Sequence, residues 1–325
     1  MMERWATDNF CILKEKIMPV QIKIEKNITD SNELLNEKEA CISFSPAHCA
    51  KFEKKGAFVV LDFGKELCGG VRIITRAVDE NADFRITFGE SLTEALSSIG
   101  EKNATNNHSP RDIKVEIPQL SDLTFGQTGF RFVRIELLSE KPVQVRNIFA
   151  INTLPYFEKE AVITTSDEEL NKIIKTAAYT LKLNFQNGYS WDGIKRDRLV
   201  WCGDLHQEIV TSLYLFGDNP NIPNSLSFLR NETPGDQWIN RIPTYSAWWV
   251  INLCDYCQMT GNTDYFKANF DYAEEVFDHI DDNVDDSGIM HFEDDGCGMP
   301  YFLDWPTFET EDAKIGTAAL LILSA

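Results

Sequence analysis

Residues 191–204 read WDGIKRDRLVWCGD, which places three carboxylates and three cations in a run that also carries two tryptophans. This mixture of side chains suits a polyol. Carboxylate and guanidinium groups can bind vicinal hydroxyls through paired hydrogen bonds, and an indole can cover the C–H face of a sugar ring. A further carboxyl can protonate a glycosidic oxygen. The run therefore predicts a carbohydrate site, and the working hypothesis is a glycosidase.

The alternative interpretation of this run is a structural ion-pair network on a solvated surface, with no chemistry. Two features favour a site. Trp191 and Trp201 are costly to leave in water, so the charged residues between them are expected to line a partly buried cleft. Gly193 and Gly203 interrupt the run, which indicates a shaped loop that enters a helix.

The composition limits the classes of partner. The chain has 325 residues, 43% of them hydrophobic and 11% aromatic, which is enough for two domains with real cores. Its formal net charge of -20 would repel nucleic acid or an anionic membrane. A neutral carbohydrate substrate is unaffected by that charge and is the expected partner, whereas the oligomeric state is left open.

The sequence predicts a soluble, cytoplasmic protein. No apolar segment near the N-terminus resembles a signal peptide, and no stretch approaches the length of a membrane span. The eight cysteines are scattered, so reduced thiols are expected. Cys254 and Cys257 form a C-x-x-C within an apolar helical stretch and are interpreted as buried core residues. No metal and no cofactor are expected.

Residues before about 155 show the patterns of β structure. Short apolar runs are bounded by glycines, and several later segments alternate strictly between apolar and polar side chains. Short half-buried strands at this spacing predict a β-sandwich domain over residues 1–155. Residues 97–111 are expected to form an exposed loop. The predicted strands are residues 58–64, 69–75, 84–89, 113–117 and 130–137.

After Pro155 the hydrophobic period becomes helical, and residues 156–325 are predicted as a second domain. Capping patterns at Ser166–Glu169 and at Asp204–Gln207 each precede an apolar stripe. The first stripe is Leu170, Ile173, Ile174, Ala177 and Leu181, and the second is Leu205, Ile209, Leu213 and Phe216. Further helices are predicted at 223–230, 243–260 and 263–282, with another that begins near Glu311.

The last of these helices stops in mid-stripe, because residues 318–325 (AALLILSA) contain no C-terminal Gly, Lys or Arg. The chain is therefore expected to be truncated. A run of helices whose connecting loops carry Trp, Asp and Arg fits consecutive helical hairpins whose loops converge on one mouth.

The segment Asp192–Asp204 resembles the active-site signature of bacterial α-L-rhamnosidases, glycoside hydrolase family 78. Residues 241–249 (RIPTYSAWW) and 302–305 (FLDW) resemble later active-site segments of the same enzymes. The resemblance implies β-sandwich domains before an (α/α)6 six-hairpin toroid, of which this chain would hold the first half. It also implies inverting hydrolysis of terminal α-L-rhamnosides by general acid/base catalysis.

The resemblance also assigns roles to individual residues. Asp197 would be the catalytic acid. An aromatic residue from 245–249 would complete the pocket, and Tyr245 is the residue expected to do so. The family often carries Arg-Asp-Glu-Arg where this chain has Arg196-Asp197-Arg198, so the acid is either the shorter Asp197 or absent. The family's general base lies in the second half of the toroid and is expected outside these residues. The substrate-binding residues would be Asp192, Arg196, Trp201, Asp204, Tyr245 and Trp305.

Two other functions stay open at this point. One is a noncatalytic carbohydrate-binding protein, which the shortened motif favours. The other is a toroid glycosidase that acts on a different sugar, since a fold alone does not fix the substrate. Trp248 and Trp249 are adjacent on a predicted helix and cannot both face one pocket, so at least one of them is expected in the core.

Overall fold

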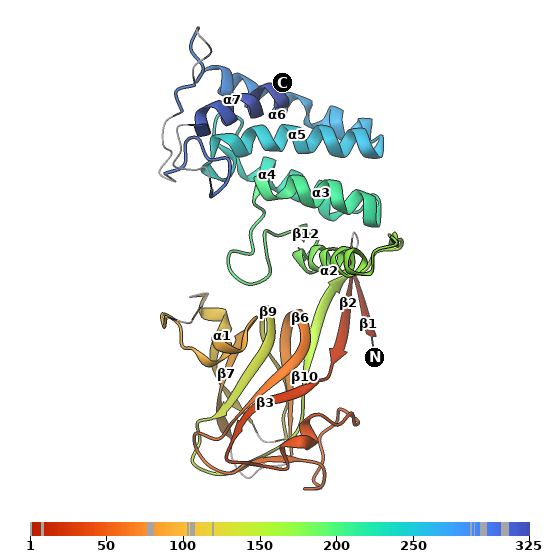
Figure 1. Ribbon diagram of the computed structural model, residues 1–325, viewed down its shortest axis with the longest axis vertical. Coiled ribbons are helices and arrows are strands. Elements are labelled where there is room, and N and C mark those ends of the chain that lie inside the picture. The colour runs from red at the N-terminus through yellow and green to blue at the C-terminus, as the bar shows by residue number, and fades with distance from the viewer. Residues whose placement is uncertain are drawn as a thin grey trace. The chain divides into compact units, whose positions relative to one another are not determined.

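Contacts divide the chain into two units, each with its own hydrophobic core (Figure 1). The computed structural model describes residues 2–7, 10–76, 81–102, 104, 108–118, 120–286, 288, 290–292, 298–306 and 312–325. The β unit consists of Met1–Thr7, Cys11–Pro155 and Gly193–Asp197. The helical unit consists of Asp8–Phe10, Tyr156–Asp192 and Arg198–Ala325.

The strands of the β unit form one sheet of ten strands within the described residues, and every pairing among β2 to β10 is antiparallel. Its main order is β1-β2-β10-β6-β9-β7-β8, while β3 pairs with β6 and β5 joins β4 to β10. The strands are β1 (Met2–Thr7), β2 (Phe10–Ile17), β3 (Gln21–Lys26), β4 (Ile28–Thr29), β5 (Ala50–Phe52), β6 (Phe58–Thr75), β7 (Ala82–Gly89), β8 (Asp112–Ile117), β9 (Asp122–Leu137) and β10 (Val143–Pro155).

The long strand β6 corrects the prediction of two separate strands at 58–64 and 69–75. Gly64, at φ +80°, marks an irregularity within β6 and does not end the strand. The Asp62 carboxylate accepts the Gly64 N–H at 2.7 Å, and pairing with β9 resumes at Leu67. At Gly69 a Cβ would lie 2.0 Å from the Ile151 carbonyl oxygen, so the glycine there permits close backbone approach.

The alternating segments 84–89, 113–117 and 130–137 are confirmed as parts of β7, β8 and β9. The inward residues of β7, Phe84, Ile86 and Phe88, have no exposed surface. Phe88 meets Phe130 of β9 with ring centroids 5.0 Å apart. The first half of β6 pairs with β3 and the second half with β10. The aromatic residues of β7 and β9 belong to one hydrophobic core with the buried residues of β6.

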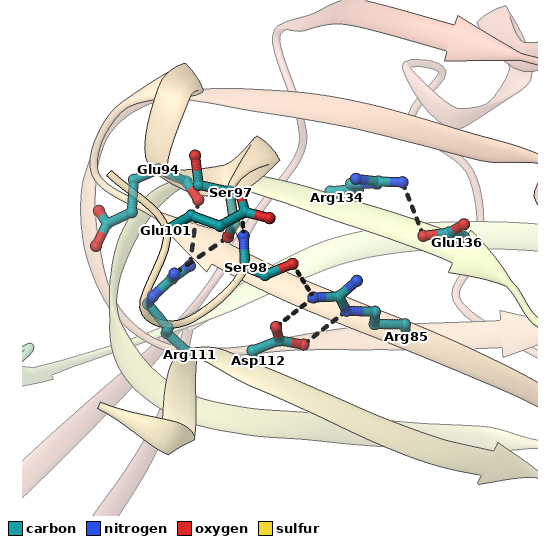
Figure 2. A network of polar contacts seen from close by, with 9 residues as sticks. All are labelled: Arg85, Glu94, Ser97, Ser98, Glu101, Arg111, Asp112, Arg134 and Glu136. Atoms are coloured by element: carbon teal, nitrogen blue, oxygen red, sulfur yellow. Dashed lines mark hydrogen bonds and ion pairs between the residues drawn. The ribbon is translucent and has the colours of Figure 1, made fainter. Parts of the chain in front are cut away.

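Part of the predicted exposed loop 97–111 is ordered by a buried arginine. Helix α1 (Leu92–Leu96) and the short 3-10 helix η2 (Ser109–Arg111) flank this stretch. Arg111 is only 1% exposed and donates to the carbonyl oxygens of Glu94 and Ser97, each at 3.1 Å (Figure 2). The expectation of exposure is wrong for Arg111, because its guanidinium caps the end of α1. Residues 103 and 105–107 of the loop lie outside the described residues.

The helical unit confirms the predicted helices, with ends shifted by a few residues. Helix α5 packs against α3, α6 and α7 (Figure 1). The predicted start near Glu311 lies outside the described residues, and the last helix is described from Asp312. The elements are α2 (Glu168–Asn184), β11 (Phe185–Gln186), β12 (Tyr189–Ser190), α3 (Cys202–Phe216), α4 (Asn221–Glu232), η3 (Ile239–Arg241), α5 (Pro243–Thr260), α6 (Thr263–Asp281) and α7 (Asp312–Ser324).

The two predicted apolar stripes differ in burial. Leu205, Ile209 and Phe216 of α3 are buried. On α2, by contrast, Leu170 is 42% and Ile173 is 58% exposed. Ile173, Ala177 and Leu181 of the α2 stripe line an open groove between α2 and α3. Sequence periodicity therefore correctly predicted an amphipathic helix but not how much of its apolar face is buried.

The interpretation of both C-x-x-C cysteines as core residues is half correct. Cys257 is buried, but Cys254 is exposed. Because an α-helix has 3.6 residues per turn, side chains three positions apart do not point in the same direction. Cys254 therefore lies outside the buried face of α5 on which Cys257 lies. Both are free thiols.

We predict that Arg111→Met destabilises the β unit by about 3 kcal/mol, because two buried carbonyls lose a charged donor. Hydrogen exchange of the β7 and β9 amides, followed in urea, measures this loss. The matched control is Arg134→Met, since Arg134 pairs with Glu136 at 2.8 Å in a partly exposed position (Figure 2). The control is expected to cost about 1 kcal/mol or less. Equal losses in the two variants would show that Arg111 does not order the loop.

Candidate active site

The helical unit contains a cavity of about 360 Å³ at the start of α3. Its volume falls in the range of small-ligand pockets, roughly 300–1,000 Å³. Four of the lining residues carry carboxyl groups, and none of the described lining residues is a lysine or arginine. The lining residues are Asp192, Gly203, Asp204, Gln207, Glu208, Tyr245, Trp248, Phe302, Leu303, Asp304 and Trp305.

Asp192 closes the loop that precedes α3. Its backbone N–H donates to the Leu199 carbonyl at 2.9 Å, and its Oδ1 accepts the Leu199 N–H at 2.9 Å. This pair of bonds joins the two ends of residues 192–199. Because one carboxylate oxygen is held by the backbone, the orientation of the Asp192 side chain in the cavity is fixed.

The start of α3 corrects the predicted cap at Asp204. The helix begins at Cys202, and Trp201 is the N-cap residue. The Cys202 N–H is accepted by Asn240 Oδ1 at 3.0 Å, and Asn240 Nδ2 donates to the Val200 carbonyl at 3.2 Å. An amide from a distant segment therefore caps the helix. Asp204 lies in the first turn, where the helix dipole favours a carboxylate, and it lines the cavity.

Gly203 is required by the packing of Tyr245. A Cβ at position 203 would lie 2.5 Å from Tyr245 Cε1 and 2.8 Å from its Cζ. The tyrosine ring therefore rests directly on the backbone of α3. Burial raises the pKa of the Tyr245 phenol, and the nearby Asp204 acts in the same direction. Tyr245 is consequently a neutral hydroxyl at any ordinary pH.

A series of aromatic contacts runs along one side of the cavity. The ring centroids of Trp201 and Tyr245 are 6.0 Å apart in an edge-on contact. Those of Tyr245 and Phe302 are 6.1 Å apart, and those of Phe302 and Trp305 are 5.3 Å apart. Trp305 is 63% exposed, so its ring is available to a ligand. Trp201 is not among the cavity-lining residues and contacts the site through Tyr245.

The adjacent tryptophans of α5 divide as predicted. Trp249 has no exposed surface and donates its Nε1–H to the Leu226 carbonyl at 3.0 Å. Trp248 lines the cavity, and its ring centroid lies 4.7 Å from that of His206. His206 forms a hydrogen bond with Asp255.

Apart from Trp201, which contacts the cavity through Tyr245, the predicted site residues separate into two groups. Asp192, Asp204, Tyr245 and Trp305 line the cavity. Arg196 and Asp197 belong by contacts to the β unit and do not line it. The two form a forked ion pair with N–O distances of 2.9 and 3.1 Å.

Glu208 is a cavity residue that the sequence analysis missed. Its Oε1 accepts from Asn184 Nδ2 at 2.9 Å, and its Oε2 accepts from the Ser190 hydroxyl. Burial raises the pKa of Glu208 to about 7, although these two hydrogen bonds oppose the rise. Glu208 follows Asp204 by four residues on α3, and this i, i+4 spacing was the available signal.

This arrangement is suited to binding a neutral polyhydroxylated molecule. Carboxylates accept hydrogen bonds from hydroxyls, and the aromatic wall offers apolar surface to C–H groups. An anionic ligand does not suit a lining that carries four carboxyl groups and, among its described residues, no lysine or arginine. Glu208 is held by two donors, and burial raises its pKa to about 7, so it is largely protonated below neutral pH.

We predict that Glu208→Gln changes how stability depends on pH. A carboxyl whose pKa is raised by folding holds its proton more tightly in the folded state. Its contribution to stability is full at low pH and falls as pH rises from about 4.5 towards about 7. The glutamine variant should therefore gain about 1–3 kcal/mol relative to the parent between about pH 5 and about pH 8.

Urea unfolding followed by tryptophan fluorescence measures this difference. Glu274→Gln, at an exposed position of α6, is the control and should show no such change. A Glu208→Gln effect that is the same at both pH values would mean that the pKa of Glu208 is not raised.

Comparisons with known proteins identify the family of the helical region. The profile of the bacterial alpha-L-rhamnosidase 6 hairpin glycosidase domain matches residues 158–325. An alpha-L-rhamnosidase of Alteromonas sp. (strain LOR) is 25% identical over 288 residues, which cover 82% of this chain. This chain spans 30% of the length of that relative.

Solved structures share the fold. A rhamnosidase from Klebsiella oxytoca with rhamnose bound matches 98% of this chain and 71% of its own, with a TM-score of 0.72 and 17% identity. A GH78 family rhamnosidase of Bacillus sp. GL1 matches 90% of this chain and 31% of its own, with a TM-score of 0.70 and 17% identity. Since the family profile covers more than half of its residues, this chain belongs to the bacterial α-L-rhamnosidase family with a six-hairpin glycosidase domain.

Proposed function

We propose that this chain is a glycoside hydrolase that cleaves terminal α-L-rhamnosides with inversion. The observation that carries the proposal is the cavity at the start of α3, where Asp192 and Asp204 of the family signature meet an aromatic wall. The cavity has the chemistry of a sugar site, and it lies in the segment that the family profile matches.

In this proposal the cavity residues bind the terminal sugar. Asp192 and Asp204 accept hydrogen bonds from sugar hydroxyls, and Tyr245 and Trp305 pack against its ring. Trp201 supports Tyr245, with which it is in edge-on contact. Arg196 is proposed to bind a further hydroxyl.

Asp197 is proposed as the general acid. Its carboxylic acid form would donate a proton to the glycosidic oxygen as the bond to the anomeric carbon breaks, and a second carboxylate would take a proton from the attacking water. In inverting enzymes these two carboxyl groups are roughly 6.5–9.5 Å apart. The general base is proposed to lie in the second half of the toroid, and none of the cavity carboxyls has that role.

We predict that Asp197→Asn, in a polypeptide that also contains the general base, lowers the rate of rhamnoside hydrolysis by roughly 10²- to 10⁴-fold with little effect on sugar affinity, because only proton transfer is lost. Hydrolysis of 4-nitrophenyl α-L-rhamnoside is measured by absorbance, and the anomer formed first is identified by NMR. Inversion releases the β-anomer. An α-anomer formed first would contradict the proposed stereochemistry.

Affinity is measured by calorimetric titration with L-rhamnose, and D-glucose serves as the comparison sugar. Asp192→Asn and Asp204→Asn should each weaken binding at least tenfold, by the loss of about 1.4 kcal/mol or more. The control is Asp264→Asn, at a side chain that is 95% exposed on α6. Saturable binding without hydrolysis would favour the noncatalytic alternative. Preference for another sugar would favour a different glycosidase, and no binding at all would overturn the site.

A cytoplasmic location is also proposed. The described cysteines Cys41, Cys49, Cys68, Cys202, Cys254 and Cys257 are free thiols, which fits a reducing compartment. Across the described residues, no helix combines the length and hydropathy needed to cross a membrane. Immunodetection after cell fractionation tests the location, and recovery outside the cytoplasm would contradict it.

A further inference from the structure

The middle of the signature loop packs with the β unit, although Asp192 and Arg198 on either side belong to the helical unit. Ile194 is only 6% exposed, and its carbonyl oxygen accepts the Gly129 N–H at 2.9 Å. A Cβ at position 129 would lie 2.6 Å from Ile194 Cγ1. The absence of a side chain at Gly129 therefore creates the space that Ile194 fills beside strand β9.

Lys195 provides a second attachment. Its side chain is 14% exposed, and its Nζ lies 2.5 Å from Glu90 Oε2 and 3.3 Å from Glu94 Oε2. The Glu94 side chain has no exposed surface. A fully buried carboxylate needs a compensating charge, so the lysine is held in place by more than a surface ion pair.

The partner of Lys195 is itself fixed in position. Glu94 lies on α1, whose first turn is capped by the Ser91 hydroxyl at 3.2 Å from the Glu94 N–H. Glu94 Oε2 also accepts the Glu90 N–H at 2.9 Å. Arg111 binds the Glu94 and Ser97 carbonyls from the other end of α1 (Figure 2). The anchor for the loop is thus a rigid part of the β unit.

A third carboxyl in this neighbourhood is kept uncharged. Burial, assisted by Glu90, raises the pKa of Glu66 to about 8. Glu66 Oε1 would lie 3.3 Å from a Cβ at position 129, which places it beside the docked Ile194.

We propose that Lys195 and Gly129 are positioning residues for Asp197, and that one role of the β unit is to hold the segment that carries this acid. This inference rests on the proposed function, in which Asp197 protonates the leaving oxygen. Asp197 follows Lys195 by two residues, and its carboxylate is paired with Arg196. Attachment at 194 and 195 therefore limits where the carboxyl can lie, and a misplacement of about 1 Å can cost roughly 100-fold in rate.

Two variants test the attachment directly. Lys195→Met keeps the aliphatic stem but removes the charge, and Gly129→Ala pushes on Ile194. Hydrogen exchange of the Gly129 amide, which donates to Ile194, reports on docking without any need for activity. We expect Lys195→Met to speed this exchange at least tenfold and Lys195→Arg to restore protection. Lys55→Met, which breaks the exposed pair with Glu140 in the same unit, is the matched control and should have no effect.

The second readout separates positioning from general loss of structure. A misplaced acid slows cleavage of a glycoside whose leaving group needs a proton, and it affects an activated leaving group much less. In a polypeptide that also contains the general base, we expect kcat/KM to fall at least tenfold for methyl α-L-rhamnoside and less than threefold for 2,4-dinitrophenyl α-L-rhamnoside. Gly129→Ala, whose disturbance is steric, should give the same pattern.

The outcomes distinguish this inference from the proposed function. Unchanged exchange at Gly129 in Lys195→Met overturns the attachment, whatever the activity. Faster exchange with equal losses on both substrates overturns the positioning role and leaves only a structural one. If a polypeptide that also contains the general base hydrolyses neither substrate, that result contradicts the proposed function and the positioning role with it, whereas the exchange result still decides the attachment.

Discussion

The closure of residues 192–199 by Asp192 and Leu199 is the constraint on which the site depends. One backbone bond and one side-chain bond, each 2.9 Å long, join the two ends of the loop. The chain can then leave the helical unit after Asp192 and return at Arg198, immediately before Trp201 and α3. The same carboxylate that closes the loop also lines the cavity, so its orientation is determined before any ligand arrives.

The cavity is lined by four residues with carboxyl groups and by closely packed aromatic rings, which together suit a neutral ligand. Gly203 lets the Tyr245 ring rest on the start of α3, and Asn240 caps that helix from a distant segment. Asp204 lies in the first turn of that helix and lines the cavity. Burial keeps Glu208 protonated until about neutral pH, which limits repulsion among the acidic side chains.

The structure separates the predicted residues that line the cavity from Arg196 and Asp197, which do not line it. The fold of a β region followed by six-hairpin-type helices agrees with the rhamnosidase structures. Asp192, Asp204, Tyr245 and Trp305 share one cavity, which is an arrangement that a sugar site requires. Arg196 and Asp197 lie in a segment that packs with the β unit, so their roles depend on how that segment is held.

The sequence by itself determined the class of each half, because period-two and period-3.6 patterns depend only on local geometry. It also determined the family, through residues 192–204, and it correctly placed α5 and one buried tryptophan. Tertiary structure alone decided that β6 is a single strand, that Asn240 caps α3, and that Arg111 and Glu94 are buried. It also decided that Lys195 contacts Glu94, 101 residues away in the chain. Such contacts join residues far apart in sequence, and no local pattern encodes the partner of a buried charge.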